Sequence, residues 1–262
     1  MTWNLAPALV AAVWGAASGA VLPRVIARLP EPDPDPLEPA ADEADFVRPV
    51  DEPKELYVDL ARLPGLAWKL AVVCAVLAGV TGARIGWSPA LLFLAYLVPV
   101  GVALALVDWR TRYLPTRLIA PSYVVVGVLV LLASLLTQDW LSLRSSAIGW
   151  VGCFAVFFVL WFISPGSMAY GDVRLAGLLG MAVGWLGIAQ LVLGMFTSFL
   201  LLAVGGIVLS FARVFHRRHM PFGPFLVAGA FLGAVFPVEL LTAYAWTVEG
   251  ATSLVRSVVD SL

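Results

Sequence analysis

The sequence predicts an all-α, polytopic integral membrane protein with about eight transmembrane helices. Of its 262 residues, 61% are hydrophobic and only 13% are charged, whereas soluble domains average about 45–50% apolar and about 25% charged residues. The apolar residues also gather in runs of roughly 20, the length that crosses a hydrocarbon core about 30 Å thick. The composition therefore excludes a globular domain surrounded by water, and the lipid bilayer is the expected environment.

Eight apolar segments make up these runs. The first, Leu5–Leu22, is expected to be a retained helix and not a signal peptide, because Arg24 and Arg28 follow it and no basic residue precedes it. The seven later segments are Leu66–Ala83, Pro89–Val107, Leu118–Leu136, Ala147–Ser164, Val173–Leu186, Gly187–Phe211 and Phe225–Trp246. Glycines around Gly187 are the only break between two of them, so that boundary is the least defined.

The first two segments are separated by an acidic, proline-rich stretch, residues 31–65. It contains 11 acidic residues, three basic residues and seven prolines. Prolines remove backbone donors and like charges repel one another, so we expect a solvated, largely unfolded loop, either a passive linker or a binding segment. The chain then divides into a first transmembrane helix (1–30), this cytoplasmic loop (31–65) and a transmembrane core (66–262).

The distribution of basic residues predicts the orientation in the membrane. With the amino terminus outside, 13 of the 16 Lys and Arg residues fall on the cytoplasmic side, as the positive-inside rule requires. The three outside are Arg84, Arg144 and Arg256. There is no concentrated basic patch, so no nucleic-acid partner is expected. Cys74 and Cys153 stand alone in apolar stretches, and the sequence predicts neither a metal site nor any other cofactor.

Two aspartates stand at the cytoplasmic ends of apolar segments. Asp108 closes one segment and Asp172 opens another, 64 residues later. Ionisable residues at membrane depth are costly and suggest function by default. Two carboxyl groups at one level can share a proton, so that one deprotonates a water molecule while the other protonates the departing group. Such a pair could hydrolyse an amide bond without a metal or a covalent intermediate.

Simpler interpretations of these aspartates remain open. Arg110 or Arg112 could neutralise Asp108, and Arg174 could neutralise Asp172, which could also cap its helix. A different functional class is also compatible with the same residues. In a transporter or ion-conducting protein, the aspartates would coordinate a cation or relay protons.

Other polar or rigid features lie in the last quarter of the chain. The segment Pro221–Pro224 is expected to be a rigid, non-helical turn near the inner surface, because its two prolines fix φ and remove donors. Glu239, after Pro237, is expected to be a snorkelling or helix-bonded acid. His216 and His219 lie in a basic loop and are assigned no ligand role.

Taken together, these motifs resemble the type IV prepilin peptidases, the bacterial aspartyl membrane proteases of the Gly-x-Gly-Asp class. Residues 19–30, with Arg28-Leu29-Pro30, resemble the end of the family's first span. Three further segments match the family. The segments are Asp108 with Leu114-Pro115 (first catalytic-aspartate motif), Tyr170-Gly171-Asp172-Val173-Arg174-Leu175 (Gly-x-Gly-Asp-x-Lys-Leu motif) and Pro221-Phe222-Gly223-Pro224-Phe225-Leu226 (Pro-Phe-Gly-Pro motif). Ala169 replaces the leading glycine of the second motif.

This resemblance implies that Asp108 and Asp172 are the catalytic pair. The residues that it places in supporting or substrate-binding positions are Pro115, Tyr170, Gly171, Arg174, Pro221, Phe222, Gly223 and Pro224. It implies a protein of the bacterial cytoplasmic (plasma) membrane with its active site at the cytoplasmic face. The implied reaction removes a short basic leader, after a glycine, from prepilin or pseudopilin-like precursors.

Two departures from the family's pattern affect what the resemblance implies. Many members carry two Cys-x-x-Cys pairs in the large cytoplasmic loop and also methylate the new amino terminus with S-adenosylmethionine. The loop 31–65 contains no cysteine, so neither a zinc-stabilised subdomain nor the methyltransferase activity is predicted here. Because Ala169 alters the Gly-x-Gly-Asp motif, an inactive homologue that acts in assembly is a third possibility.

Overall fold

The computed structural model describes residues 4–30, 56–164, 168–211 and 221–247, and the regular elements within these ranges are all helices. They are α1 (Leu5–Ile26), α2 (Tyr57–Ala61), α3 (Leu66–Ile85), α4 (Ala90–Thr111), α5 (Thr116–Thr137), α6 (Trp140–Ile163), α7 (Tyr170–Leu186), α8 (Ile188–Phe211) and α9 (Gly223–Val235). Each of the eight expected apolar segments overlaps one long helix, and in chain order these helices are α1 and α3–α9. Residues 31–55 of the acidic loop, and His216 and His219, lie outside the described residues.

The all-α, polytopic membrane fold is confirmed. In the described ranges, six helices are long and apolar enough to cross a membrane: α1, α3, α4, α5, α6 and α8. A bent pair that begins with α9 would raise this number to seven. Of the eight expected spans, α7 is the one that this count leaves out. It has 17 residues and a length of about 26 Å. Almost all of α7 is buried among other helices, so its length is not set by contact with lipid.

The last apolar segment differs from the single span expected over Phe225–Trp246. Helix α9 ends at Val235, and a second helix, Pro237–Thr247, leaves it at an angle of 102°. Phe236 separates the two, with the non-helical dihedrals φ −127° and ψ 43°. Proline lacks the N–H that would continue the helical hydrogen bonds and disfavours the α conformation in the residue before it, so the chain turns at this point.

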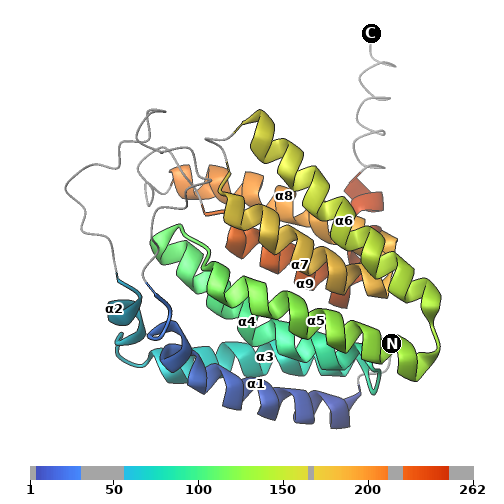
Figure 1. Ribbon diagram of the computed structural model, residues 1–262, viewed down its shortest axis with the longest axis horizontal. Helices are drawn as coiled ribbons and strands as arrows, with labels where there is room; N and C mark the ends of the chain where they lie inside the picture. Colours follow the sequence, from blue (N-terminus) through green and yellow to red (C-terminus); the bar gives the residue numbers. More distant parts are fainter. Residues whose placement is uncertain (1–3, 31–55, 165–167, 212–220, 248–262) are drawn as a thin grey trace.

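The helices lie side by side in one bundle (Figure 1), in which α1 packs on α3, α6 on α7 and α8 on α9 most extensively. Close helix pairs depend on glycine. A Cβ atom at Gly180 would collide with the carbonyl group of Gly149, and one at Gly233 would collide with Gly194. Small residues at such crossings let two backbones approach within contact distance, which favours helix association in lipid.

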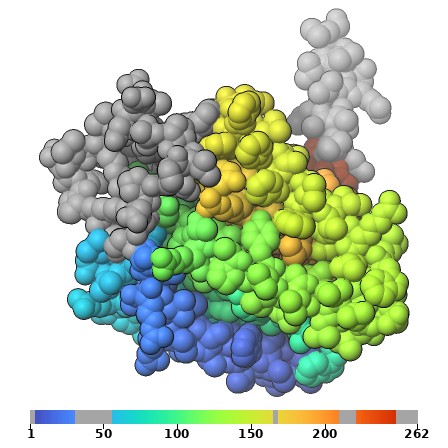
Figure 2. All heavy atoms as spheres, viewed as in Figure 1, coloured from blue at the N-terminus to red at the C-terminus, as the bar shows by residue number. Residues whose placement is uncertain are grey.

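Helix α4 is the element that connects the parts of the bundle. It contacts α1 and α3 on one side, and α5, α7 and α9 on the other. In the space-filling view, atoms of α5 and α6 make up much of the visible face (Figure 2). Helices α5 and α6 expose large apolar side chains such as Val124, Val128 and Val151, as expected for helices in contact with lipid.

The end of the acidic loop is folded, in contrast to the expected unfolded stretch. Helix α2 lies within residues 56–65, and its Tyr57 and Leu60 are buried in a small cluster with Ile26 of α1 and Val107 of α4. Burial of these apolar groups stabilises α2 against the local charge repulsion. The carboxyl-terminal end of the loop is therefore attached to α1 and to Val107, the residue before Asp108.

Candidate active site

Asp108 lies on the last turn of α4, and its position follows from how that helix ends. Arg112 takes the left-handed conformation (φ 55°) and its N–H donates to the carbonyl oxygen of Asp108 at 2.8 Å. This is the hydrogen bond of an αL helix cap. The hydroxyl group of Thr111 donates to the carbonyl oxygen of Val107 at 2.8 Å. The carboxyl group of Asp108 is thus held on a well-defined turn, and the residue is 4% exposed.

Gly223 contacts Asp108 from the neighbouring helix α9. Its backbone N–H donates to Oδ2 of Asp108 at 2.9 Å, and a Cβ atom at Gly223 would lie only 2.7 Å from the same oxygen. A side chain at this position would therefore displace the carboxyl group. Because Gly223 is the first residue of α9, the positive end of the helix dipole faces Asp108.

The expectation of a wholly non-helical Pro221–Pro224 turn is wrong. Only Pro221 and Phe222 precede the helix, whereas Gly223 and Pro224 form the first turn of α9. Proline is tolerated there because the N–H groups of a first turn have no helical partner and its φ is already helical. The N–H group that binds Asp108 therefore belongs to the first turn of a helix and not to a loop.

Phe222 anchors this segment between two other helices. Its ring lies 5.7 Å from that of Phe157 on α6 and 5.4 Å from that of Phe199 on α8, and the latter two rings are 5.6 Å apart. Aromatic contacts at these distances stabilise beyond simple burial. Sequence reasoning missed Phe157 and Phe199, since nothing distinguishes them from the other aromatic residues in their apolar runs.

Asp172 is the third residue of α7 and is also 4% exposed. Its Oδ2 accepts the N–H of Ala169 at 3.3 Å, so the helix-capping interpretation is confirmed for this oxygen. Oδ1 is buried, and no described residue forms a hydrogen bond with it. Ala169 has φ −79° and ψ 147°, an extended conformation open to any residue. The replacement of the motif's leading glycine is therefore compatible with the backbone.

The structure brings the two aspartates together. Helices α4 and α7 are in contact, and the carboxyl groups of Asp108 and Asp172 are close enough for their charges to interact. Each group has one oxygen bonded to a backbone N–H, from Gly223 and Ala169 respectively. Two neighbouring carboxyl groups, each with one oxygen held by a backbone N–H, are the residue types that general acid and base action on one water molecule needs.

The connection between α4 and α5 packs against the start of α7. A Cβ atom at Gly171 would lie 2.7 Å from the Cβ atom of Leu114, and both Leu114 and Pro115 are buried. Gly171 does not have a positive φ, as it lies within α7 and is absent from the positive-φ glycines of the described ranges. The glycine before Asp172 therefore serves close approach and not an unusual backbone conformation.

Arg174 attaches α7 to α5. The Arg174 guanidinium lies 4.4 Å from the centre of the Tyr170 ring and donates to the hydroxyl oxygen of Thr116. The Tyr123 hydroxyl donates to the carbonyl oxygen of Arg174 at 2.6 Å. A Cβ atom at Gly177 would overlap this hydroxyl group. Thr116 and Tyr123 were not found from the sequence, because their partners are more than 50 residues away.

The described ranges contain no cluster of three or more His, Cys, Asp or Glu residues.

The comparisons with known proteins agree with the motifs. The profile of the type IV leader peptidase family matches residues 95–245. A prepilin leader peptidase/N-methyltransferase of Burkholderia pseudomallei strain 1026b is 31% identical over 136 residues, which cover 49% of this chain and 41% of the relative. A protein of the same name from Neisseria gonorrhoeae is 28% identical over 170 residues, which cover 62% and 55%. The chain spans about half the length of these relatives.

No solved structure matches the chain significantly. The family profile, however, covers more than half of the 262 residues and includes Asp108, Asp172 and Gly223. The chain therefore belongs to the type IV leader peptidase family.

Proposed function

We propose that this protein is a membrane aspartyl endopeptidase that removes the leader peptide from prepilin or pseudopilin-like precursors. The observation that carries the proposal is the convergence of Asp108 and Asp172 from two different helices. One carboxyl group accepts a proton from water as it attacks the scissile carbonyl carbon. The other donates a proton to the departing amine. Family membership favours this reaction over transport or ion conduction by the same aspartates.

The position of the two aspartates along their helices supports cleavage of the substrate beside its own transmembrane helix. Asp108 is 18 residues from the start of α4 and Asp172 is 14 residues from the end of α7, distances of about 27 and 21 Å along the helix axes. Both carboxyl groups then lie near one boundary of a hydrocarbon core about 30 Å thick. We propose that this boundary is the cytoplasmic face of the bacterial plasma membrane, with the amino terminus of the chain outside.

A direct assay tests this proposal. The full chain is purified in detergent and mixed with a precursor that has a short basic leader, a glycine and then a hydrophobic helix, and the amino terminus of the product is read by mass spectrometry. We expect loss of the leader after the glycine. With S-adenosylmethionine added, the same spectrum reports methylation, for which the sequence contains no recognisable donor site. An uncut precursor at equal enzyme and substrate concentrations would contradict the proposal.

The Tyr123 contact provides a finer prediction. Tyr123→Phe keeps the ring but removes the hydroxyl group that donates to Arg174, so the first turn of α7 with Asp172 is held less firmly. We expect kcat to fall several-fold, as for the loss of one hydrogen bond of about 1 kcal/mol, with little change in KM. Tyr96→Phe is the matched control, because its hydroxyl group bonds Ser122, between α4 and α5. Equal kinetics for the two variants would contradict this role.

A further inference from the structure

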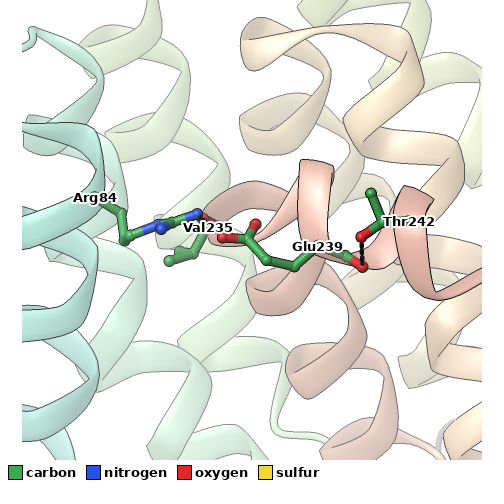
Figure 3. Close-up of polar contacts among 4 residues, drawn as sticks. All are labelled: Arg84, Val235, Glu239 and Thr242. Atoms are coloured by element: carbon green, nitrogen blue, oxygen red, sulfur yellow. Dashed lines mark hydrogen bonds and ion pairs between the residues drawn. The ribbon is translucent and has the colours of Figure 1, made fainter. Parts of the chain in front are cut away.

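The break in the last apolar segment is held by a side chain from another helix. The guanidinium group of Arg84, near the end of α3, forms an ion pair with Glu239 and donates through Nε to the carbonyl oxygen of Val235 at 3.2 Å. It also lies 4.9 Å from the centre of the Phe236 ring. Arg84 therefore contacts the last residue of α9 and a residue of the next helix (Figure 3). It also contacts Phe236, the residue at the break.

These contacts show at which end of the bundle the break lies. Arg84 lies one residue before the end of α3, and α9 begins at Gly223, the residue that bonds Asp108. The break is therefore at the end of α9 farthest from the carboxyl pair. The 13 residues of α9 measure about 20 Å, which is short of the 30 Å or so of a hydrocarbon core.

The ion pair itself favours a polar surrounding. The Arg84 side chain is 13% exposed and the Glu239 side chain 43%. A charged group exposed to the hydrocarbon interior is costly, whereas the interfacial region solvates it. We therefore expect the Arg84–Glu239 pair to lie at the membrane boundary.

The helix after the break has the side chains of an interfacial element. Tyr244 holds it against α8, through its ring on Phe196 at 5.2 Å and its hydroxyl group on Thr197 at 2.6 Å. Trp246 is 80% exposed, and Thr242 is exposed as well. Tyrosine and tryptophan are enriched where one end of the ring contacts apolar groups and the other contacts water or headgroups.

We propose that the helix Pro237–Thr247 lies in the lipid headgroup layer, on the membrane face opposite the carboxyl pair, and that Arg84 holds it at that level. The turn of 102° directs this helix along the membrane surface when α9 runs along the membrane normal. The partner of its exposed side is therefore the phospholipid headgroup and glycerol region. This helix does not complete a transmembrane span.

Site-directed spin labelling of the full chain in phospholipid vesicles tests the depth of this helix. The native cysteines, Cys74 and Cys153, are replaced by alanine, and single cysteines are placed at Val238 or Ala245. Both residues are exposed and lie seven residues apart on one face. A helix along the membrane normal would separate the two labels by about 10 Å in depth. The matched control pair is Val124 and Leu131 on the span α5, also exposed and seven residues apart.

We expect the labels at 238 and 245 to differ in depth by less than half of the separation measured for the α5 pair. A difference equal to that of the α5 pair, or any value above half of it, would overturn the proposal. The role of Arg84 is tested by Arg84→Gln, which removes the ion pair. The label at 238 should then become more mobile while the label at 124 does not change, and an unchanged label at 238 would contradict the role of Arg84.

Discussion

Asp108→Asn and Asp172→Asn are each expected to abolish leader removal while leaving a folded, membrane-inserted protein. Asparagine keeps a side-chain oxygen that can still accept the N–H of Gly223 or of Ala169. It cannot accept or donate the proton that the reaction moves. Since general acid–base action contributes about 10²–10⁴-fold to a rate, the product should fall by at least about 100-fold. Mass spectrometry of the precursor's amino terminus measures this loss.

Asp139→Asn is the matched control for this pair of substitutions. Asp139 caps α6, and its carboxylate accepts the backbone N–H of Ser142 at 3.0 Å, a role in which asparagine is equally effective. The same change of charge at this distant position should leave the rate within about twofold. Normal leader removal by either active-site variant would contradict the proposed pair. Equal support of pilus or secretion assembly by the variants and the parent would favour an inactive assembly homologue.

Gly223→Ala is the second substitution with a large expected effect. The added methyl group would lie 2.7 Å from Oδ2 of Asp108, closer than real contacts allow, so the carboxyl group or the first turn of α9 must move. A displacement of about 1 Å in an active site can cost on the order of 100-fold in rate. We expect kcat to fall by about 10- to 100-fold, and the thermal unfolding midpoint to fall much less than for a core substitution.

Gly152→Ala controls for the loss of a glycine from a membrane helix. A Cβ atom at Gly152 would meet no atom within 4 Å, so alanine there should leave the rate unchanged. Similar losses of activity in the two variants would show that the effect at Gly223 is not due to Asp108. An unchanged rate for Gly223→Ala would contradict the importance of the hydrogen bond between α9 and Asp108.

The helices were predictable because lipid imposes a strong constraint on sequence. Apolar runs of membrane length have few alternative structures. Each expected segment overlaps a helix, and the expected division at Gly187 separates α7 from α8. The aspartates were equally visible, because a charge beside an apolar run is conspicuous. Their role, however, was inferred from a resemblance, and the simple capping interpretation of Asp172 is also correct for one of its oxygens.

The remaining features depend on contacts between distant parts of the chain. Helix α2 has only five residues and follows an acidic stretch, so its burial against Ile26 and Val107 leaves no periodic signal. The bend at Phe236 was missed because Pro237 can also occur within a membrane helix, where neighbouring groups replace the lost hydrogen bond. The partner that holds this bend is Arg84, 155 residues before Glu239.

Cross-linking of two cysteines at positions 108 and 172 tests the central feature most directly. The chain carries Asp108→Cys and Asp172→Cys, with Cys74 and Cys153 replaced by alanine, and is treated in membranes with a short bismaleimide. Intact mass spectrometry then distinguishes an intramolecular bridge from two separate adducts. A Thr116→Cys, Arg174→Cys pair, whose native side chains are in contact, serves as the positive control. We predict a bridge between positions 108 and 172. If the control pair is bridged but positions 108 and 172 carry two separate adducts, the convergence of the two carboxyl groups is contradicted.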